Sequence, residues 1–176
     1  MLLLVFDTET THLLAEKTVN ICRIVQLSWI LYDTDTNITE ENDFILNSYS
    51  PITNSQIHGI TTKMSKRGYD FSEIVDIFLE DVRNSDLIVG HNIQYDLNAI
   101  EVELGRLDRW DDIDYLFSKE SFDTMKEAYK ILKLKKFPKL VSLYKYFFGK
   151  DFDNAHNALF DVKATKECYL KLNFNC

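Results

Sequence analysis

Residues 1–10 read MLLLVFDTET, and they indicate both a central strand and a chemical site. Residues 2–6 form an unbroken apolar run of the length that a fully buried β-strand requires. Asp7 and Glu9 follow, and because side chains alternate along a strand we expect them to point to the same side, with Thr8 pointing away. Two carboxylates this close repel each other unless a cation lies between them. Mg²⁺ or Mn²⁺ suits such hard oxygen ligands.

A solvated surface is the alternative interpretation of this acidic pair. The chain has 28 acidic residues among 176, so an acid-x-acid pattern also arises by chance. The position of Asp7 and Glu9 argues against chance, because burying charged groups at the end of an apolar strand is costly without a compensating partner.

The composition is that of one folded domain spanning residues 1–176. The chain is 45% hydrophobic and 13% aromatic, which is enough for a single core. Its three cysteines have neither zinc-ligand spacing nor an even count, which favours reduced thiols in an intracellular protein. The apolar start ends at Asp7 and has no basic segment before it, so we expect neither a signal peptide nor a membrane span. A soluble protein of the cytoplasm or nucleus, without a membrane partner, is predicted.

The charge is unevenly distributed along the chain. A net charge of −8 argues against indiscriminate binding to nucleic acids. Residues 126–150 nevertheless contain eight lysines and one acid, Glu127, so this segment carries +7 and the remainder −15. Such a stripe could guide a polyanion toward a metal site. The simpler interpretation, a solvated helix face, is the one that we favour from the sequence.

Hydrophobic periodicity and turn residues predict the remaining elements. Further strands are expected at 24–32, 43–46, 86–89 and 121–124, the first two of them completing an antiparallel meander with the strand at 2–6. Helices are expected from residue 54 for about one turn, from 70 as a longer amphipathic helix, and at 94–105, 124–134, 138–148 and 157–172. Residues 108–114 are interpreted as an acidic connector. We expect Asp123 to cap the helix that follows it, and His91 to have a structural role.

One sequence pattern occurs twice. Residues 91–99 and 156–164 share His-Asn-x-x-aromatic-Asp-x-x-Ala, which places a carboxylate early in each of two helices. Four carboxylates and one histidine are the components of two-metal phosphodiester hydrolysis, in which a histidine with a near-neutral pKa takes the proton of the attacking water. In chain order the candidate catalytic residues are Asp7, Glu9, Asp96, His156 and Asp161.

The order Asp-x-Glu, Asp, His-x-x-x-x-Asp resembles the DEDDh exonucleases. These form the DnaQ-like branch of the RNase H-like superfamily and include the proofreading subunits of DNA polymerases and TREX-type nucleases. The matching stretches are FDTETT at 6, IHGIT at 57, HNIQYD at 91, FDT at 122, LVSLYKYFFG at 140 and HNALFDVKAT at 156. The resemblance implies an α/β, RNase H-like fold with a mixed five-stranded sheet, its first three strands antiparallel and the others parallel, flanked by helices.

The resemblance also implies roles for individual residues. Asp7 would bridge two divalent cations, Mg²⁺ or Mn²⁺, and Glu9 and Asp161 would complete the shell of the water-activating ion. Asp96 would hold the second ion, and His156 would be the general base. The implied substrate contacts are Thr8, Thr10, Leu13, His58, Ile60 and Asn92.

Position 12 departs from the pattern. Relatives usually have glycine after the two threonines, whereas this chain has His12. Glycine permits positive φ more readily than histidine does, so the loop that carries Leu13 is expected to differ. A sharper hypothesis is that His12 itself contacts the nucleic acid.

The implied reaction is the stepwise 3′-to-5′ release of nucleoside 5′-monophosphates from single-stranded ends. The segments DTETT and IHGIT are more similar to those of the DNA enzymes, so single-stranded DNA is the expected substrate and a polymerase a candidate partner. An exoribonuclease is the alternative within the family, since discrimination depends on contacts to the 2′-hydroxyl.

Two interpretations of other classes compete with a nuclease. A haloacid-dehalogenase phosphatase would use Asp7 as a nucleophile, but it requires aspartate at position 9 and leaves His156 without a role. An inactive exonuclease fold that binds nucleic acid or protein would lack a ligand or the base, and this sequence lacks neither.

Overall fold

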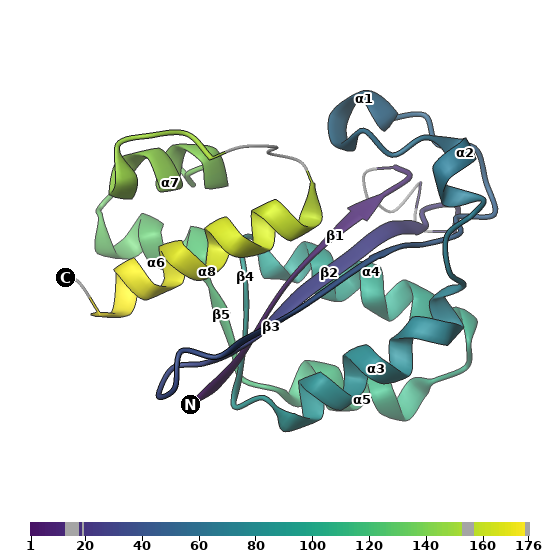
Figure 1. Cartoon of the computed structure of the whole chain (residues 1–176), viewed down its shortest axis with the longest axis horizontal. Helices are drawn as coiled ribbons and strands as arrows, with labels where there is room; N and C mark the ends of the chain where they lie inside the picture. Colours follow the sequence, from purple (N-terminus) through teal and green to yellow (C-terminus); the bar gives the residue numbers. More distant parts are fainter. Residues whose placement is uncertain (13–17, 19, 153–156, 175–176) are drawn as a thin grey trace.

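The computed structural model describes residues 1–12, 18, 20–152 and 157–174 (Figure 1). Its strands form one sheet of five in the order β3-β2-β1-β4-β5. The β1–β2 and β2–β3 pairs are antiparallel, whereas β1–β4 and β4–β5 are parallel. This arrangement confirms the predicted mixed sheet. The strands are β1 (Leu2–Thr10), β2 (Ile24–Asp33), β3 (Thr39–Ile45), β4 (Leu87–Gly90) and β5 (Ser121–Asp123).

Helices cover both faces of the sheet (Figure 1). One face is covered by α3, α4 and α5, and the other by α8, on which α6 and α7 pack. Among the described residues, no helix has both the length and the apolar character needed to cross a membrane. The helices are α1 (Ser55–His58), α2 (Thr62–Ser65), α3 (Phe71–Asn84), α4 (Ile93–Arg106), α5 (Trp110–Ser118), α6 (Thr124–Ile131), α7 (Leu140–Phe148) and α8 (Ala158–Phe174).

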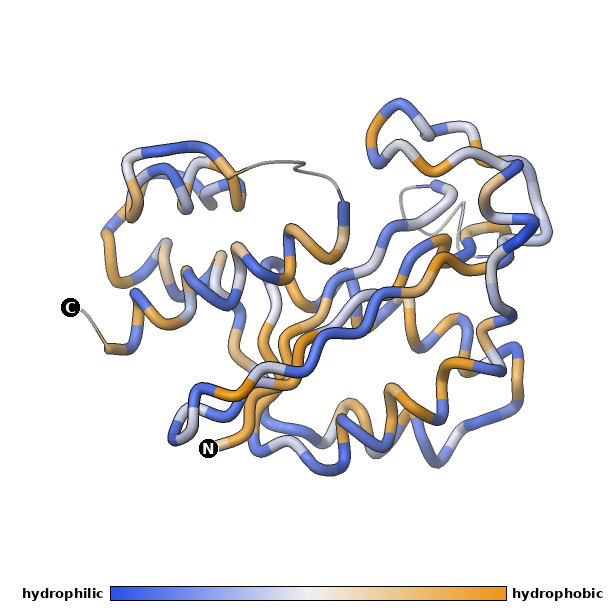
Figure 2. Tube along the Cα trace, viewed as in Figure 1, coloured by the Kyte–Doolittle hydropathy of each residue, from blue (hydrophilic) through white to orange (hydrophobic). Residues whose placement is uncertain are grey.

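Strand β1 is buried on both sides, as its apolar run predicts. Leu4 and Phe6 belong to the core cluster beneath α3 and α4, whereas Leu3 and Val5 pack against α8. Figure 2 shows hydrophobic residues along the centre of the sheet and on the neighbouring helices. Because side chains alternate along a strand, Asp7 continues the face toward α8. The side of the sheet to which a β1 side chain points therefore determines which helix it contacts.

The predicted acidic connector at 108–114 is wrong. Most of this segment belongs to α5, in which Leu116 is fully buried and Ile113 packs against the core. Its acids stabilise the helix locally, since Asp111 and Asp112 lie in the first turn, where the helix dipole favours negative charge. The carboxylate of Asp112 also accepts hydrogen bonds from Arg83 and Arg109.

Several other boundaries differ from the prediction by a few residues, and two of these differences have a clear cause. Strand β3 extends back to Thr39, because backbone pairing with β2 holds this polar edge segment where the apolar pattern is weak. Helix α6 ends at Ile131 rather than 134, because Lys133 adopts a left-handed conformation with φ 51°.

Candidate active site

Three carboxylates meet at the carboxyl end of β1. Asp7 and Glu9 come from the strand, and Asp161 comes from the first turn of α8. One oxygen from each lies within 4.8 Å of the others, and all three residues are partly buried. The alternation of β1 directs Asp7 and Glu9 toward α8, so this cluster confirms that they share a side of the strand.

The start of α8 is fixed by a side chain of β2. The amide of Ala158 donates to Gln26 Oε1 at 3.3 Å, and Gln26 Nε2 donates to Asp43 Oδ1 at 2.7 Å. Gln26 is the register partner of Glu9 across the β1–β2 pair. It therefore positions the helix that carries Asp161. We did not select Gln26 from the sequence, although a buried amide in an apolar strand is a signal for such a role.

Asp96 approaches the cluster from the opposite face of the sheet. It lies on α4, is only 3% exposed, and its Oδ1 accepts from the Thr8 amide at 3.0 Å and the Thr8 hydroxyl at 2.7 Å. These bonds exist because the pairing of β4 with β1 ends at Val5, so no described strand occupies this edge of β1 beside Thr8. Thr8, which we predicted as a substrate contact, thus holds Asp96 next to Asp7.

The electrostatics of the cluster favour a bound cation. Burial, and then the charges of Asp161 and Asp96, raise the pKa of Glu9 to about 8. Burial also raises the pKa of Asp96 to about 7 although the Thr8 hydrogen bonds lower it. The pKa of Asp7 is raised well above its usual value by burial and by the charges of Asp96, Asp161 and Glu9. Such carboxylates need protons or a cation, and an all-oxygen donor set fits Mg²⁺ or Mn²⁺.

Two further predicted substrate contacts lie near the same edge of the sheet. His58 and Ile60 are both buried, and the Ile60 amide donates to His58 Nδ1 at 3.2 Å. His58 ends α1 and Ile60 follows it. The start of α1 is tied to β1 because Asn54 Nδ2 donates to the Thr10 carbonyl at 2.8 Å. The Thr10 hydroxyl donates to the His12 carbonyl at 2.7 Å. Contact of His58, Ile60 and Thr10 with the substrate stays a prediction.

Asn92, another residue that we predicted to contact the substrate, lies in the turn between β4 and α4. This residue adopts a left-handed conformation with φ 67°, and its amide donates to Asp123 Oδ1 at 2.9 Å. The same Asp123 oxygen accepts from the Met125 amide at 3.0 Å, which confirms Asp123 as the cap of α6. The Asn92 side chain is exposed, so it is available to a ligand.

His91 has the structural position that we predicted. Its Nε2 donates to the Pro138 carbonyl at 3.1 Å, and its Nδ1 lies 2.9 Å from the Thr124 hydroxyl. Burial lowers its pKa, which favours the neutral ring. His91 therefore joins β4 to the segment between α6 and α7.

Two predicted residues lie outside the described part of the chain. Leu13 and His156 both fall in the ranges that the structure does not describe, so their roles stay predictions. Of the five predicted catalytic residues, the described four all come to the carboxyl end of β1: Asp7, Glu9, Asp96 and Asp161.

Comparison with known proteins places the chain in a family. The model of the exonuclease family RNase_T matches residues 4–169. DNA polymerase III subunit epsilon of Rickettsia conorii is 32% identical over 178 residues, covering 96% of this chain and 72% of that protein. The same subunit of Buchnera aphidicola is 31% identical over 115 residues, covering 65% of this chain and 47% of that protein.

A solved structure supports the same fold. The nuclease domain of 3′hExo, a DEDDh family member bound to rAMP, superposes with a TM-score of 0.78 at 16% identity, covering 99% of this chain and 93% of that one. At this identity the likeness concerns the fold, and the family assignment rests on the sequence matches. The chain belongs to the exonuclease family, as a DnaQ-like 3′–5′ exonuclease.

Proposed function

We propose that this chain removes nucleoside 5′-monophosphates one at a time from the 3′ end of single-stranded DNA, using two divalent cations and a histidine base. The cluster of Asp7, Glu9 and Asp161 carries this proposal, because its oxygens lie within 4.8 Å of one another on a buried strand end. Family membership supplies the reaction class.

Asp7 is the residue best suited to share both cations. The charges of Glu9, Asp96 and Asp161 all raise its pKa, so it has the other three acids as neighbours. Glu9 and Asp161 would complete one site, and Asp96, held by Thr8, would support the other. Bound Mg²⁺ or Mn²⁺ would polarise the scissile phosphate, make water more acidic and stabilise the leaving oxygen.

His156 is proposed as the base that takes the proton from the attacking water. The motif places it five residues before Asp161, and an imidazole with a pKa near neutrality is suited to that transfer. The family resemblance supports this assignment.

Single-stranded DNA and a polymerase partner are supported by the names of the two curated relatives, which are polymerase subunits. The chain spans only 47% of one of these relatives and 72% of the other, so the activity and partners of the whole proteins are proposals here. An exoribonuclease is the second candidate, since the nuclease domain of 3′hExo was solved with rAMP. An intracellular location fits the free, buried thiols of Cys22 and Cys168.

The decisive assay compares a 5′-labelled DNA strand with an RNA strand of matched sequence, each with Mg²⁺, Mn²⁺ or EDTA. We expect a ladder that shortens from the 3′ end, faster on DNA, with nucleoside 5′-monophosphates as products. EDTA and the Asp7→Ala variant should abolish it, whereas Asp114→Ala, an exposed acid on α5, should not.

Other outcomes would separate the alternatives. Faster loss of RNA would favour the exoribonuclease. Strand binding without hydrolysis under either metal would favour an inactive binding module. Full activity of Asp7→Ala would contradict the proposed site.

A further inference from the structure

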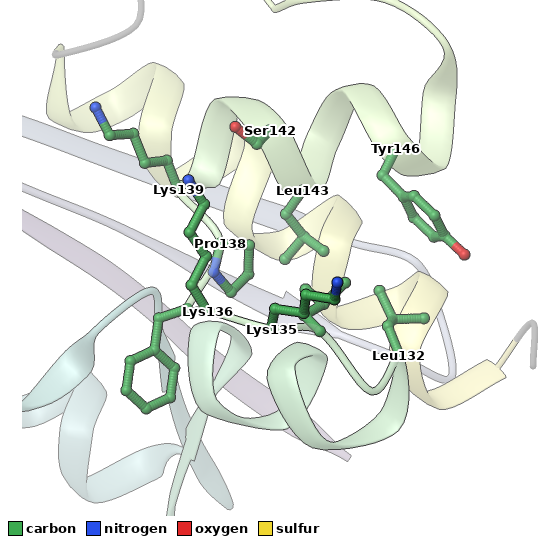
Figure 3. Close-up of a pocket in the computed structure, with 10 residues that line it drawn as sticks. Leu132, Lys135, Lys136, Pro138, Lys139, Ser142, Leu143 and Tyr146 are labelled. Carbon is green, nitrogen blue, oxygen red and sulfur yellow. The ribbon is translucent and has the colours of Figure 1, made fainter.

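A pocket lies between α6 and α7, outside the acidic cluster. It has a volume of about 620 Å³. Figure 3 shows Leu132 and Leu143 in the pocket, with Tyr146 on one side and Lys136 and Lys139 on the other. An apolar floor with lysines at its rim is unlike the acidic site, and neither the reaction chemistry nor the family match gives this pocket a role.

The end of α6 creates this pocket. The left-handed Lys133 closes the helix, and the Leu134 amide donates to the Tyr129 carbonyl at 3.1 Å. The chain then continues through residues 135–139 before α7 begins, and these residues form one wall of the pocket. The lysine-rich segment is therefore only partly helical, and the interpretation of the whole stripe as one solvated helix face does not hold.

The lysines of this wall differ from those on the flanking helices. Lys126, Lys130 and Lys145 each contact a carboxylate, at 3.4, 2.6 and 3.0 Å respectively. With respect to the described residues, no hydrogen bond or ion pair involves the amino groups of the three lysines of the wall, Lys135, Lys136 and Lys139. Their charge is locally uncompensated, which favours a polyanionic ligand.

Aromatic rings are exposed beside these charges. Tyr146 and Phe137, which both line the pocket, are 65% and 54% exposed. Phe137 is supported from behind by Tyr129, with ring centroids 4.8 Å apart. Exposed rings interleaved with lysines are the combination on which single-stranded nucleic acids stack their bases and pair their phosphates.

The pocket wall is tied to the edge of the sheet that carries the acids. His91 Nε2 donates to the Pro138 carbonyl at 3.1 Å, and His91 directly follows β4. The next residue, Asn92, leads into α4, which carries Asp96. Because β1 and β4 are parallel, their carboxyl ends lie at the same edge. A strand whose 3′ end lies at the acids can therefore extend along this edge to the pocket.

We propose that the α6–α7 pocket binds the body of a single-stranded nucleic acid on the 5′ side of the nucleotide being removed. Lys135, Lys136 and Lys139 would contact phosphates, and Tyr146 would stack on a base. The site extends the proposed function, on which it rests for the polarity of the strand.

The test measures binding of a 5′-labelled single strand in EDTA, so that no hydrolysis is needed for the result. Removing two phosphate contacts in Lys135→Gln/Lys136→Gln should reduce the slope of log affinity against log salt by about 1.4. The matched control is Lys166→Gln/Lys171→Gln, on the later part of α8, which removes the same charge and should leave the slope unchanged.

Stacking is tested separately at Tyr146. Tyr146→Ala should weaken binding by about fivefold or more, whereas Tyr146→Phe, which keeps the ring, should bind like the wild type. Hydrolysis of a dinucleotide, which has one nucleotide on the 5′ side of the scissile bond and no strand beyond it, should keep its kcat/KM in every pocket variant. Unchanged affinity and salt slope in these variants would contradict strand binding by the pocket and leave the nuclease proposal intact. Reduced binding in these variants, together with a wild type that binds the strand but hydrolyses nothing, would support the pocket and contradict the nuclease proposal.

Discussion

At the scale of single residues, burial at the end of β1 changes the protonation of Glu9 and Asp96. Their pKa values are raised to about 8 and about 7, mainly by burial, so without metal both carboxyl groups hold protons near neutral pH more readily than exposed acids do. A divalent cation competes with these protons, and its binding therefore releases protons into solution.

A pH dependence of stability follows in the absence of metal. The pKa of Glu9 rises on folding from 4.5 to about 8, so the folded chain binds more protons than the unfolded chain across that range. The contribution of Glu9 to the free energy of unfolding is therefore lost as pH rises through about 8. Urea unfolding in EDTA should show lower stability at higher pH within this window. Mg²⁺ should restore it, and Glu9→Gln should flatten the dependence. Equal slopes for Glu9→Gln and the wild type would contradict this prediction.

Thr8 provides a second prediction. Thr8→Val keeps the shape of the side chain but removes the hydroxyl that donates to buried Asp96 at 2.7 Å. Losing this donor should destabilise the fold by about 1–3 kcal/mol and reduce kcat, because Asp96 is no longer held beside Asp7. Thr8→Ser retains the donor and is the matched control. Urea unfolding and steady-state turnover are the measurements. Equal stability and equal kcat in the valine and serine variants would show that the Thr8 hydroxyl does not position Asp96.

His156 is tested by turnover and metal binding together. His156→Ala should lower kcat by a factor on the order of 10² or more, because the water loses its proton acceptor. Affinity for Mn²⁺, measured by calorimetry, should stay close to that of the wild type. Near-normal turnover would exclude His156 from the mechanism. Loss of Mn²⁺ binding together with turnover would indicate that His156 is a metal ligand and not a base.

Residue patterns identified the acids of the cluster more readily than the residues that position them. Asp7 and Glu9 could be chosen because they follow an apolar strand, and Asp96 and Asp161 because they recur in one motif. The sequence marks Gln26 only as a polar residue within an apolar strand. Its partner could not be predicted, because Gln26 lies across from Glu9 in a register that only the folded sheet defines. For the same reason, a bond between Thr8 and Asp96 could not be inferred from residues 88 positions apart.

At the scale of elements, α4 is attached to the sheet at two points two turns apart. Asp96 bonds Thr8 of β1, and buried Glu103 accepts from the Ile24 amide of β2 at 3.1 Å. Glu103 also pairs with Arg23 at 2.8 Å and with Arg106 at 3.1 Å. These contacts fix the helix that delivers Asp96.

Glu103→Ala should therefore be strongly destabilising. It leaves the Ile24 amide and two partly buried guanidinium groups without their shared carboxylate, and breaking a buried ion pair in this way costs roughly 3–5 kcal/mol. Glu101→Ala, at an exposed position on the same helix, is the matched control and should change stability little. The free energy of urea unfolding distinguishes them, and similar values for both variants would contradict the anchoring role of Glu103.

Elements with one clear apolar face were predictable, and those set by tertiary contacts were less so. The helix α3 was expected from Asp70, and a capping box with Glu73 starts it there. Helix α5 was missed because its acids suggested a solvated connector, whereas Leu116 and the bonds to Asp112 hold it against the core. The end of α6 depends on the backbone of Lys133, which the apolar pattern does not encode.

At the scale of the whole molecule, the fold brings together acids that are far apart in the chain. Strand β1 lies in the middle of the sheet, with α4 on one face and α8 on the other. Its end therefore meets Asp96 from one side and Asp161 from the other. The mixed sheet was predicted through the family resemblance, since local patterns alone do not determine the order of strands.

Calorimetric titration of Mn²⁺ tests the proposed metal site most directly, because it needs neither substrate nor turnover. The site predicts that the wild type binds Mn²⁺ with release of protons, that Asp7→Asn and Asp161→Asn lose this binding, and that Asp114→Asn on α5 retains it. Binding of Mn²⁺ that is the same in Asp7→Asn as in the wild type would show that the carboxyl end of β1 is not the metal site.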